Sequence, residues 1–156
     1  MNAHDTNFLT IEGLSKSFSI ASGLFSRPFT LRALQDISFT VKKGETLGIV
    51  GESGCGKSST AKAILKLVDP TSGEIAWRGE RIETLSPARM RPFRRELQAV
   101  FQGPYSSLNP RMRAADIVSE PIRNFEAASE DEIGERVAAL FDRVGLRADQ
   151  MVKYPY

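Results

Sequence analysis

The chain has 156 residues, of which 41% are hydrophobic and 26% are charged, and its formal net charge is +2. This composition is typical of a globular domain with a real hydrophobic core and excludes a disordered tail. The net charge is too small to indicate a nucleic acid or an anionic membrane as a partner, and a single cysteine, Cys55, excludes an internal disulfide framework. The polar start MNAHDTN and the lack of any run of roughly 20 apolar residues predict a cytoplasmic chain.

Strands are predicted in the first part of the chain. Apolar residues alternate loosely over residues 9–20 (LTIEGLSKSFSI) and cleanly over residues 37–41 (ISFTV). Between them, residues 21–33 predict a loop because of their Gly, Ser and Pro content. Residues 46–50 (TLGIV) are apolar with little alternation, which predicts a strand covered on both faces.

A helix is predicted directly after the glycine-rich stretch that follows this strand. Its expected inward stripe has helical spacing and consists of Ala61, Ile64, Leu65 and Val68. Asp69 and Pro70 are expected to end this helix. A further strand is predicted over residues 74–79 (EIAWRG), a basic and partly helical segment over residues 86–96, and another apolar strand over residues 97–102 (LQAVFQ).

The remaining chain is predicted to be helical from about Arg113. Ser129 and Glu132 have the spacing of a capping box, and Gly145 lies where a C-terminal cap belongs. The helix between them is expected to bury an apolar stripe formed by Ile133, Val137, Leu140, Phe141 and Val144.

The glycine-rich stretch, residues 51–59 (GESGCGKSS), fits the pattern G-x-x-x-x-G-K-[ST] with Gly51, Gly56, Lys57 and Ser58. Glycines let backbone N–H groups turn inward, and these donors form an anion cradle together with the positive end of the following helix. The pattern places the Lys57 ammonium against the β- and γ-phosphates and the Ser58 hydroxyl where it ligates Mg²⁺. Since strand, loop and helix occur in this order, the sequence predicts a site for a nucleoside triphosphate with Mg²⁺. The alternative is a glycine-rich turn with a solvated lysine.

Cys55 lies within this loop, near a helix N-terminus that favours a thiolate. The simpler interpretation is a small side chain that fits the loop. In either case, a bulky alkyl group on Cys55 is expected to block nucleotide entry.

Several motifs occur together and in a definite order: LSKSF, ISFTVKKGETLGIVGESGCGKSST, DPTSGEIAWRGERI and LQAVFQGPYSSLNPRM. In this order they resemble the ATP-binding subunits of ABC transporters, most of all the branch that imports oligopeptides, dipeptides or nickel. The resemblance covers residues 9–156. It implies an α/β P-loop NTPase of the ABC type, with an antiparallel β subdomain, a truncated parallel sheet and an incomplete α-helical subdomain.

The resemblance also implies roles for individual residues. Phe18 matches the aromatic residue that stacks on adenine, although a strand aromatic that fills the core is the alternative. Gln102 matches the glutamine that reaches Mg²⁺ and the attacking water. The residues implied in nucleotide binding are Phe18, Gly51, Gly54, Cys55, Gly56, Lys57, Ser58 and Ser59. Lys57 and Gln102 are the implied catalytic residues, and Ser58 and Gln102 the implied Mg²⁺ ligands.

By the same resemblance, residues 1–105 form the ATP-binding core and residues 106–156 form part of the helical subdomain. The expected activity is ATP hydrolysis coupled to uptake of peptides or a related small solute. The expected partners are integral-membrane permease subunits, which meet the helical subdomain and the Gln102 loop, and a second ATPase subunit, identical or related. The expected location is the cytoplasmic face of the plasma membrane, as a peripheral protein.

The sequence departs from the family pattern in two places. Gly103 stands where an acidic residue usually precedes the proline, which makes transport coupling less certain than nucleotide binding. No LSGGQ signature, no strand ending in paired acids (the Walker B motif) and no histidine switch occurs in the sequence. These departures predict a fragment that binds ATP but does not hydrolyse it alone.

Three alternatives stay open at this point. The first is a naturally short protein that binds ATP without turnover, and the second is a fragment that binds a permease. The third is a small-molecule kinase, which would need a substrate lid containing arginines. The four arginines Arg89, Arg91, Arg94 and Arg95 are interpreted as a solvated basic face rather than a nucleic-acid site, because few aromatic residues lie among them.

Overall fold

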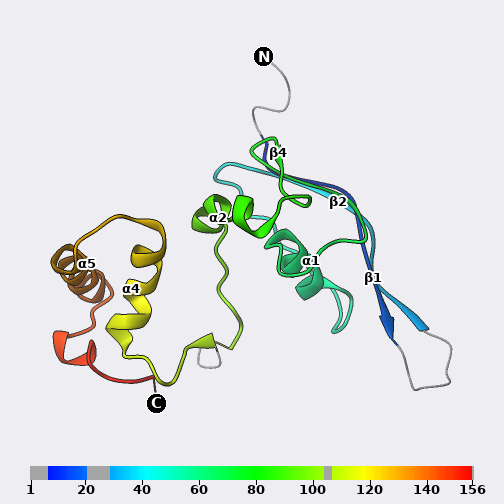
Figure 1. The fold of residues 1–156 in the computed structure, drawn as a ribbon. Coiled ribbons are helices and arrows are strands. Elements are labelled where there is room, and N and C mark those ends of the chain that lie inside the picture. The colour runs from blue at the N-terminus through cyan, green and yellow to red at the C-terminus, as the bar shows by residue number, and fades with distance from the viewer. Residues whose placement is uncertain (1–6, 21–28, 104–106, 156) are drawn as a thin grey trace. The chain divides into compact units, whose positions relative to one another are not determined.

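The computed structural model describes residues 7–20, 29–103 and 107–155. The chain divides into two compact units, Met1–Arg91 and Pro92–Tyr156, and each is described by itself. The first unit holds the strands and the glycine-rich loop, and the second is helical (Figure 1).

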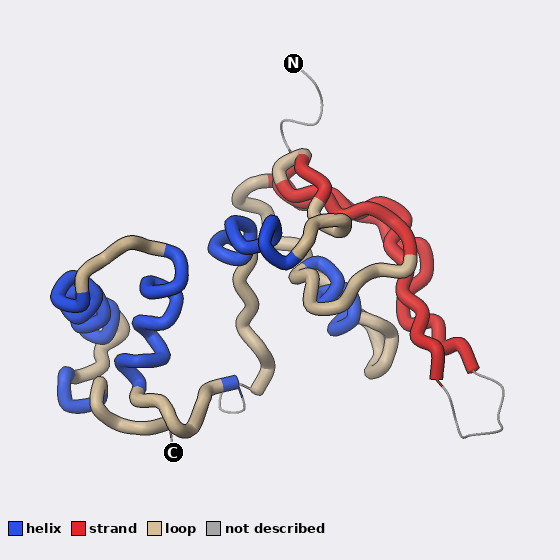
Figure 2. The backbone as a smooth tube through the Cα atoms, viewed as in Figure 1, coloured by secondary structure: helices blue, strands red, loops and turns tan. Residues whose placement is uncertain are grey.

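The first unit contains a four-stranded sheet in the order β2-β1-β3-β4. Its strands are β1 (Asn7–Ile20), β2 (Phe29–Lys42), β3 (Ser72–Trp77) and β4 (Glu80–Arg81), and every neighbouring pair is antiparallel. β1 and β2 form one long hairpin, and β3 accompanies β1 only as far as the pair Ser15–Ser72. The end of the hairpin therefore extends beyond the sheet, as the red strands in Figure 2 show.

One face of this sheet supplies the core of the first unit. Ile11, Leu14, Leu34 and Ile75 are buried there, together with Ile82, Leu85 and Met90 from the segments that follow the sheet. The expected strands at residues 9–20, 37–41 and 74–79 are therefore confirmed, although β3 itself ends at Trp77. Residues 29–33, predicted as loop, belong instead to β2, because pairing with β1 overrides their local composition; residues 21–28 of that predicted loop lie outside the described residues.

Helix α1 (Lys57–Ile64) follows the glycine-rich loop, as predicted, and ends before Asp69. Its buried residues are Thr60 and Ala63, so the expected inward stripe of Ala61, Ile64, Leu65 and Val68 is wrong. The helix packs a narrow face of small side chains against its surroundings, and its more apolar side is left half-exposed or exposed.

Two predicted strands are absent among the described residues. Residues 46–50 and 97–102 belong to no strand and no helix. Their apolar side chains are exposed, among them Leu47, Ile49, Val50, Val100 and Phe101. The prediction is wrong for a physical reason: an extended apolar segment becomes a buried strand only where neighbouring strands pair with it, and no described residue does so.

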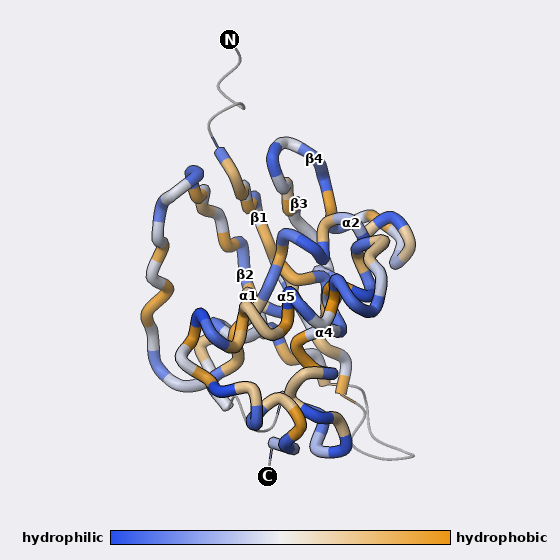
Figure 3. Tube along the Cα trace, turned by 90° about the vertical axis from the view of Figure 1, so that its left-hand side faces the viewer, coloured by the Kyte–Doolittle hydropathy of each residue, from blue (hydrophilic) through white to orange (hydrophobic). Residues whose placement is uncertain are grey.

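The second unit is built on two helices that pack against each other, α4 (Ala114–Phe125) and α5 (Glu130–Arg143), followed by a 3₁₀ turn, η2 (Ala148–Gln150). Helix α2 (Pro87–Glu96), expected from the basic segment, joins the two units along the chain. The core between α4 and α5 consists of Ile122, Ile133, Val137 and Phe141. Hydrophobic and hydrophilic residues are interspersed along both helices (Figure 3).

Both ends of α5 follow the predicted capping rules. At its start, the Ser129 Oγ accepts from the Glu132 N–H at 3.3 Å, and the Glu132 carboxylate accepts from the Ser129 N–H at 2.8 Å. The hydrogen bond from the Ser129 N–H, together with one that the Ser129 hydroxyl donates to the same carboxylate at 3.0 Å, lowers the pKa of the Glu132 carboxyl. At its end, Gly145 has φ 75°, and Leu146 N–H reaches the Phe141 carbonyl at 2.9 Å, which is the Schellman arrangement.

The stripe predicted for α5 is only partly right. Ile133, Val137 and Phe141 are buried, but Leu140 is 44% exposed and Val144 is 69% exposed. Helical spacing places these two near the buried stripe, yet no described segment covers the C-terminal end of the helix on that side.

Candidate functional site

The glycine-rich loop makes close contact with β2 at Gly56. Gly56 has φ 100°, and a Cβ at this position would lie 2.7 Å from the Ala33 carbonyl oxygen and 2.8 Å from Leu34 Cδ2. Any other residue would therefore push the loop off the strand and would also be strained at this backbone angle. The second glycine of the pattern thus fixes the loop against the edge of the sheet.

The first glycine of the pattern also leaves no room for a side chain. A Cβ on Gly51 would lie 2.6 Å from Cys55 Sγ. Cys55 is exposed and lies in the loop, so its thiol sits where the chain turns back toward α1.

The Lys57 side chain folds back over the loop. Its ammonium group donates to the carbonyl oxygens of Gly51 and Glu52, both at 2.6 Å, and lies 3.4 Å from Cys55 Sγ. An ammonium has three donors, so two make strong bonds to the loop, and the third has only a weak sulfur acceptor that a better acceptor can replace. A positive charge is thereby held inside the loop at the start of α1.

The first turn of α1 adds donors to this charge. The first intrahelical bond runs from Thr60 N–H to the Gly56 carbonyl at 2.9 Å, so the preceding amides lie outside the helical ladder. The helix has no acidic residue in its first turn and no side-chain cap. The N-terminal end is therefore suited to an anion, with the exposed Ser58 hydroxyl beside it.

Phe18 lies on β1 near this loop. It pairs with Leu31 of β2, two residues before Ala33, which contacts the loop, and it is 38% exposed. The Lys16 ammonium lies 4.9 Å from the centre of its ring and donates to the Asp69 carbonyl oxygen at 2.6 Å. The partial exposure argues against the alternative of a core aromatic and leaves ring surface available to a ligand.

A hollow of about 360 Å³ lies between β2 and the part of the loop formed by Gly54 and Cys55. Its lining consists of Arg32, Ala33, Leu34, Gln35, Ile37, Gly54 and Cys55. Sequence reasoning found Gly54 and Cys55 through the loop pattern but missed the β2 residues, because they were placed in or after a predicted loop and carry no motif.

Gln102, the predicted catalytic glutamine, lies in the second unit. It is exposed and ends the irregular segment 97–102, which is followed by Gly103. Its proposed contact with Mg²⁺ and water stays a prediction.

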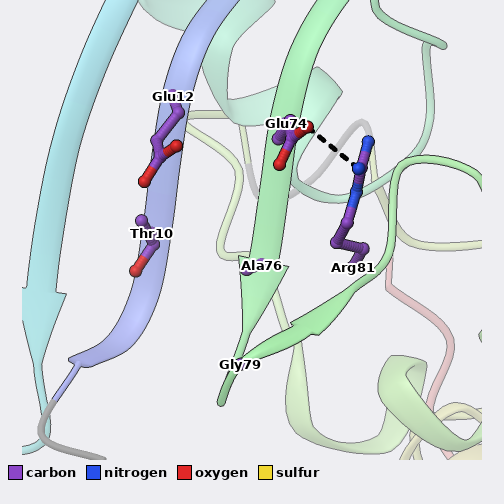
Figure 4. A pocket seen from close by; sticks show the side chains of 6 residues that line it. All are labelled: Thr10, Glu12, Glu74, Ala76, Gly79 and Arg81. Atoms are coloured by element: carbon purple, nitrogen blue, oxygen red, sulfur yellow. Dashed lines mark ion pairs between the residues drawn. The ribbon is translucent and has the colours of Figure 1, made fainter. Parts of the chain in front are cut away.

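A second hollow lies on the polar face of the sheet and is lined by Thr10, Glu12, Glu74, Ala76, Gly79 and Arg81 (Figure 4). Glu12 and Glu74 are directly paired across β1 and β3, and the Arg81 guanidinium lies 2.9 Å from the Glu74 carboxylate. Arg81 also pairs at 2.6 Å with Glu83, a buried residue that no sequence motif indicated. Burial raises the pKa of Glu83, but hydrogen bonds from Arg81 and from Ile75 N–H outweigh it and lower this pKa overall. These charges hold β3, β4 and the following segment together and play a structural role.

Among the described residues, no helix is both long enough and apolar enough to cross a membrane.

Comparison with curated proteins finds relatives that are ATP-binding proteins of transporters. A probable peptide ABC transporter ATP-binding protein of Sinorhizobium fredii, y4tS, is 45% identical over 94% of this chain and 42% of its own length. The glutathione import ATP-binding protein GsiA of Salmonella choleraesuis is 44% identical over 95% of this chain and 24% of its own length. The oligopeptide transport ATP-binding protein OppF of Haemophilus influenzae is 41% identical over 95% of this chain and 46% of its own length. The chain thus spans less than half the length of these relatives.

Comparison with solved structures shows the fold. A dimeric post-hydrolysis state of the ATP-binding cassette MJ0796, bound to ADP and Pi, superposes with a TM-score of 0.76. Its sequence identity is 24%, and the match covers 94% of this chain and 61% of that one. The protein cbiO1 of Clostridium perfringens, part of the transporter complex cbiONQ, matches with a TM-score of 0.69 and 27% identity over 96% of this chain and 54% of its own.

The expected fold, an α/β cassette of the ABC type with an antiparallel β subdomain and a helical part, is therefore confirmed. The parallel sheet that was also expected has no strand among the described residues. The family described as ABC transporter matches residues 34–155, which include the glycine-rich loop, α1 and the helix pair. This chain belongs to the ABC transporter family of ATP-binding proteins.

Proposed function

We propose that this chain binds MgATP through residues 51–59, within an ATP-binding subunit of an importer for peptides or related small solutes. The observation that carries the proposal is the position of the Lys57 ammonium, 2.6 Å from the carbonyl oxygens of Gly51 and Glu52 at the start of α1. A cation held in this way, beside amides outside the helical ladder, is arranged for a polyphosphate before any ligand arrives.

Each residue of the proposed site has one task. The amides of the loop, which include those of Gly54, Cys55, Gly56 and Ser59, surround the β-phosphate, and Lys57 faces the β- and γ-phosphates. Phe18 offers a flat face to adenine.

The residues present also fit a magnesium ion. Mg²⁺ prefers oxygen ligands, and the exposed Ser58 hydroxyl lies on the first turn of α1 beside the loop. Gln102 is proposed as a further ligand from the family resemblance alone. When bound, the ion supplies positive charge that balances the phosphate oxygens. Gln102 then positions the attacking water when the subunit hydrolyses ATP.

The names of the relatives extend the proposal to the whole protein. The relatives at 41–45% identity are named for peptide, glutathione and oligopeptide transport, so peptide-like solutes are the proposed cargo. The proposed partners are membrane permease subunits, which meet the helical part and the Gln102 segment, and a second ATPase subunit. The proposed place of action is the cytoplasmic face of the membrane, and the proposed domains are residues 1–105 and 106–156.

The direct test is the affinity of a fluorescent ATP analogue for two lysine variants. Lys57→Ala removes the ammonium inside the loop, and Lys62→Ala removes the same charge from the exposed side of the same helix. We expect Lys57→Ala to lose all measurable binding and Lys62→Ala to bind within about twofold of the unchanged chain, because an exposed charge farther along α1 is screened. Equal binding by Lys57→Ala and Lys62→Ala would contradict the proposed site.

A further inference from the structure

The hollow between β2 and the loop has an unusual charge balance. Of the seven described residues that line it, Arg32 is the one with a formal charge, and none is acidic. Within residues 7–20, 29–103 and 107–155, the Arg32 guanidinium makes no hydrogen bond or ion pair. Among the described residues, therefore, no acceptor binds the donors of this cation and no carboxylate neutralises it.

The order of residues along β2 places the backbone of Arg32 between two parts of the proposed nucleotide site. Leu31 pairs with Phe18, the proposed adenine platform, and Ala33 contacts Gly56 of the proposed phosphate loop. Arg32 lies between these two β2 residues and pairs with Ser17. In a nucleoside triphosphate, the sugar and the α-phosphate likewise lie between the base and the β-phosphate.

We propose that Arg32 is a further nucleotide-binding residue, whose guanidinium binds the sugar–α-phosphate part of ATP in the hollow beside Gly54 and Cys55. This inference rests on the proposed function and adds a residue that the loop pattern does not contain. A guanidinium suits the task because its planar donors fit phosphate oxygens in pairs and it stays charged at any physiological pH. A hollow of about 360 Å³ is within the range of small-molecule sites.

The position also explains why β2 needs its irregular register here. The pair Lys16–Leu34 is followed by the pair Ser17–Arg32, so Ala33 is one extra residue on β2. Such a bulge bends the strand and redirects the side chains beside it. The carbonyl oxygen of this extra residue lies against Gly56, and Arg32 next to it lines the same hollow as Gly54 and Cys55.

The test compares Arg32→Gln with Lys43→Gln, which removes the same charge from an exposed position in the turn after β2. Calorimetric affinities are measured for MgATP and MgGTP, and Arg32→Lys serves as the conservative variant. We expect Arg32→Gln to weaken both nucleotides about five- to tenfold and by the same factor, because the proposed contact does not reach the base. Arg32→Lys should recover part of the affinity, and Lys43→Gln should stay within about twofold.

The outcomes separate this inference from the proposed function. If the unchanged chain binds MgATP and Arg32→Gln binds it as well as Lys43→Gln does, the inference is wrong while the proposed loop stands. A loss confined to one of the two bases would also contradict it, since it would place Arg32 at the base. If the folded, unchanged chain binds neither nucleotide, the proposed function itself fails.

Discussion

The α4–α5 pair and residues 46–50 are both rich in apolar residues, but the first buries its apolar side chains and the second exposes them. In the helix pair, Ile122, Ile133, Val137 and Phe141 are buried against one another, and α5 is capped at both ends. In residues 46–50, Val50 is 94% exposed, and no backbone hydrogen bond joins the segment to another described residue. The two helices are neighbours in the sequence and bury each other's apolar side chains. A strand is buried only when other strands, which can be distant in the sequence, pair with it.

This difference has a consequence for the proposed site. On its N-terminal side, the loop that starts at Gly51 follows residues 46–50, which form no backbone hydrogen bond with another described residue. On its C-terminal side, the loop continues into α1 and contacts β2 at Gly56. The geometry of Lys57 and Gly56 is therefore maintained by the loop, α1 and the sheet edge. Stability in this chain is expected to come from the sheet core and the helix pair rather than from residues 46–50.

The largest effect on stability is expected from a cavity in the core between α4 and α5. Phe141→Ala removes a buried ring and should reduce the free energy of unfolding of the helical unit by about 3–5 kcal/mol, because the cavity left behind cannot fully collapse. Urea unfolding followed by far-ultraviolet circular dichroism measures this loss.

The control for that experiment is Leu140→Ala in the same turn of α5. Leu140 is 44% exposed, so its truncation should cost less than about 1 kcal/mol. A similar loss for both variants would show that the observed core does not carry the stability of the pair.

A smaller effect is expected at the start of α5. Ser129→Ala removes the hydroxyl that accepts the Glu132 N–H and should lower the free energy of unfolding by about 1 kcal/mol. Ser129→Asp, which can accept the same hydrogen bond, should keep most of that stability in the same denaturation assay. The capping interpretation is wrong if the alanine and aspartate variants unfold together.

The smallest effect is expected in the exposed segment. Ile49 is 47% exposed, so Ile49→Ser should change the free energy of unfolding by no more than about 0.5 kcal/mol. Thermal unfolding of the two proteins side by side measures the difference. A loss above about 2 kcal/mol would mean that residues 46–50 are packed in solution and would remove the contrast with the helix pair.

Local signals made much of this fold predictable. The capping box at Ser129, the cap at Gly145 and the loop pattern around Lys57 depend on short-range spacing, and each appears in the structure where the sequence placed it. Alternation likewise predicted β1, the C-terminal part of β2, and β3.

What the sequence could not show depends on distant partners. Residues 29–33 became strand through pairing with β1, and Leu140 and Val144 stayed exposed because no described segment covers them. The position of Arg32 depends on the register of β2, and that of Glu83 depends on its burial beside Arg81. Neither residue belongs to a recognisable sequence pattern. A single sequence records which residues are apolar but not which partner covers them.

Residues 51–59 are proposed to bind the polyphosphate of a nucleotide, with Lys57 supplying a positive charge. The most direct measurement of this binding is a calorimetric titration of the unchanged chain with MgATP, after circular dichroism has confirmed that the chain is folded. We predict saturable binding of one nucleotide per chain that MgADP competes away. A folded chain that gives only heats of dilution over the same titration would contradict the account.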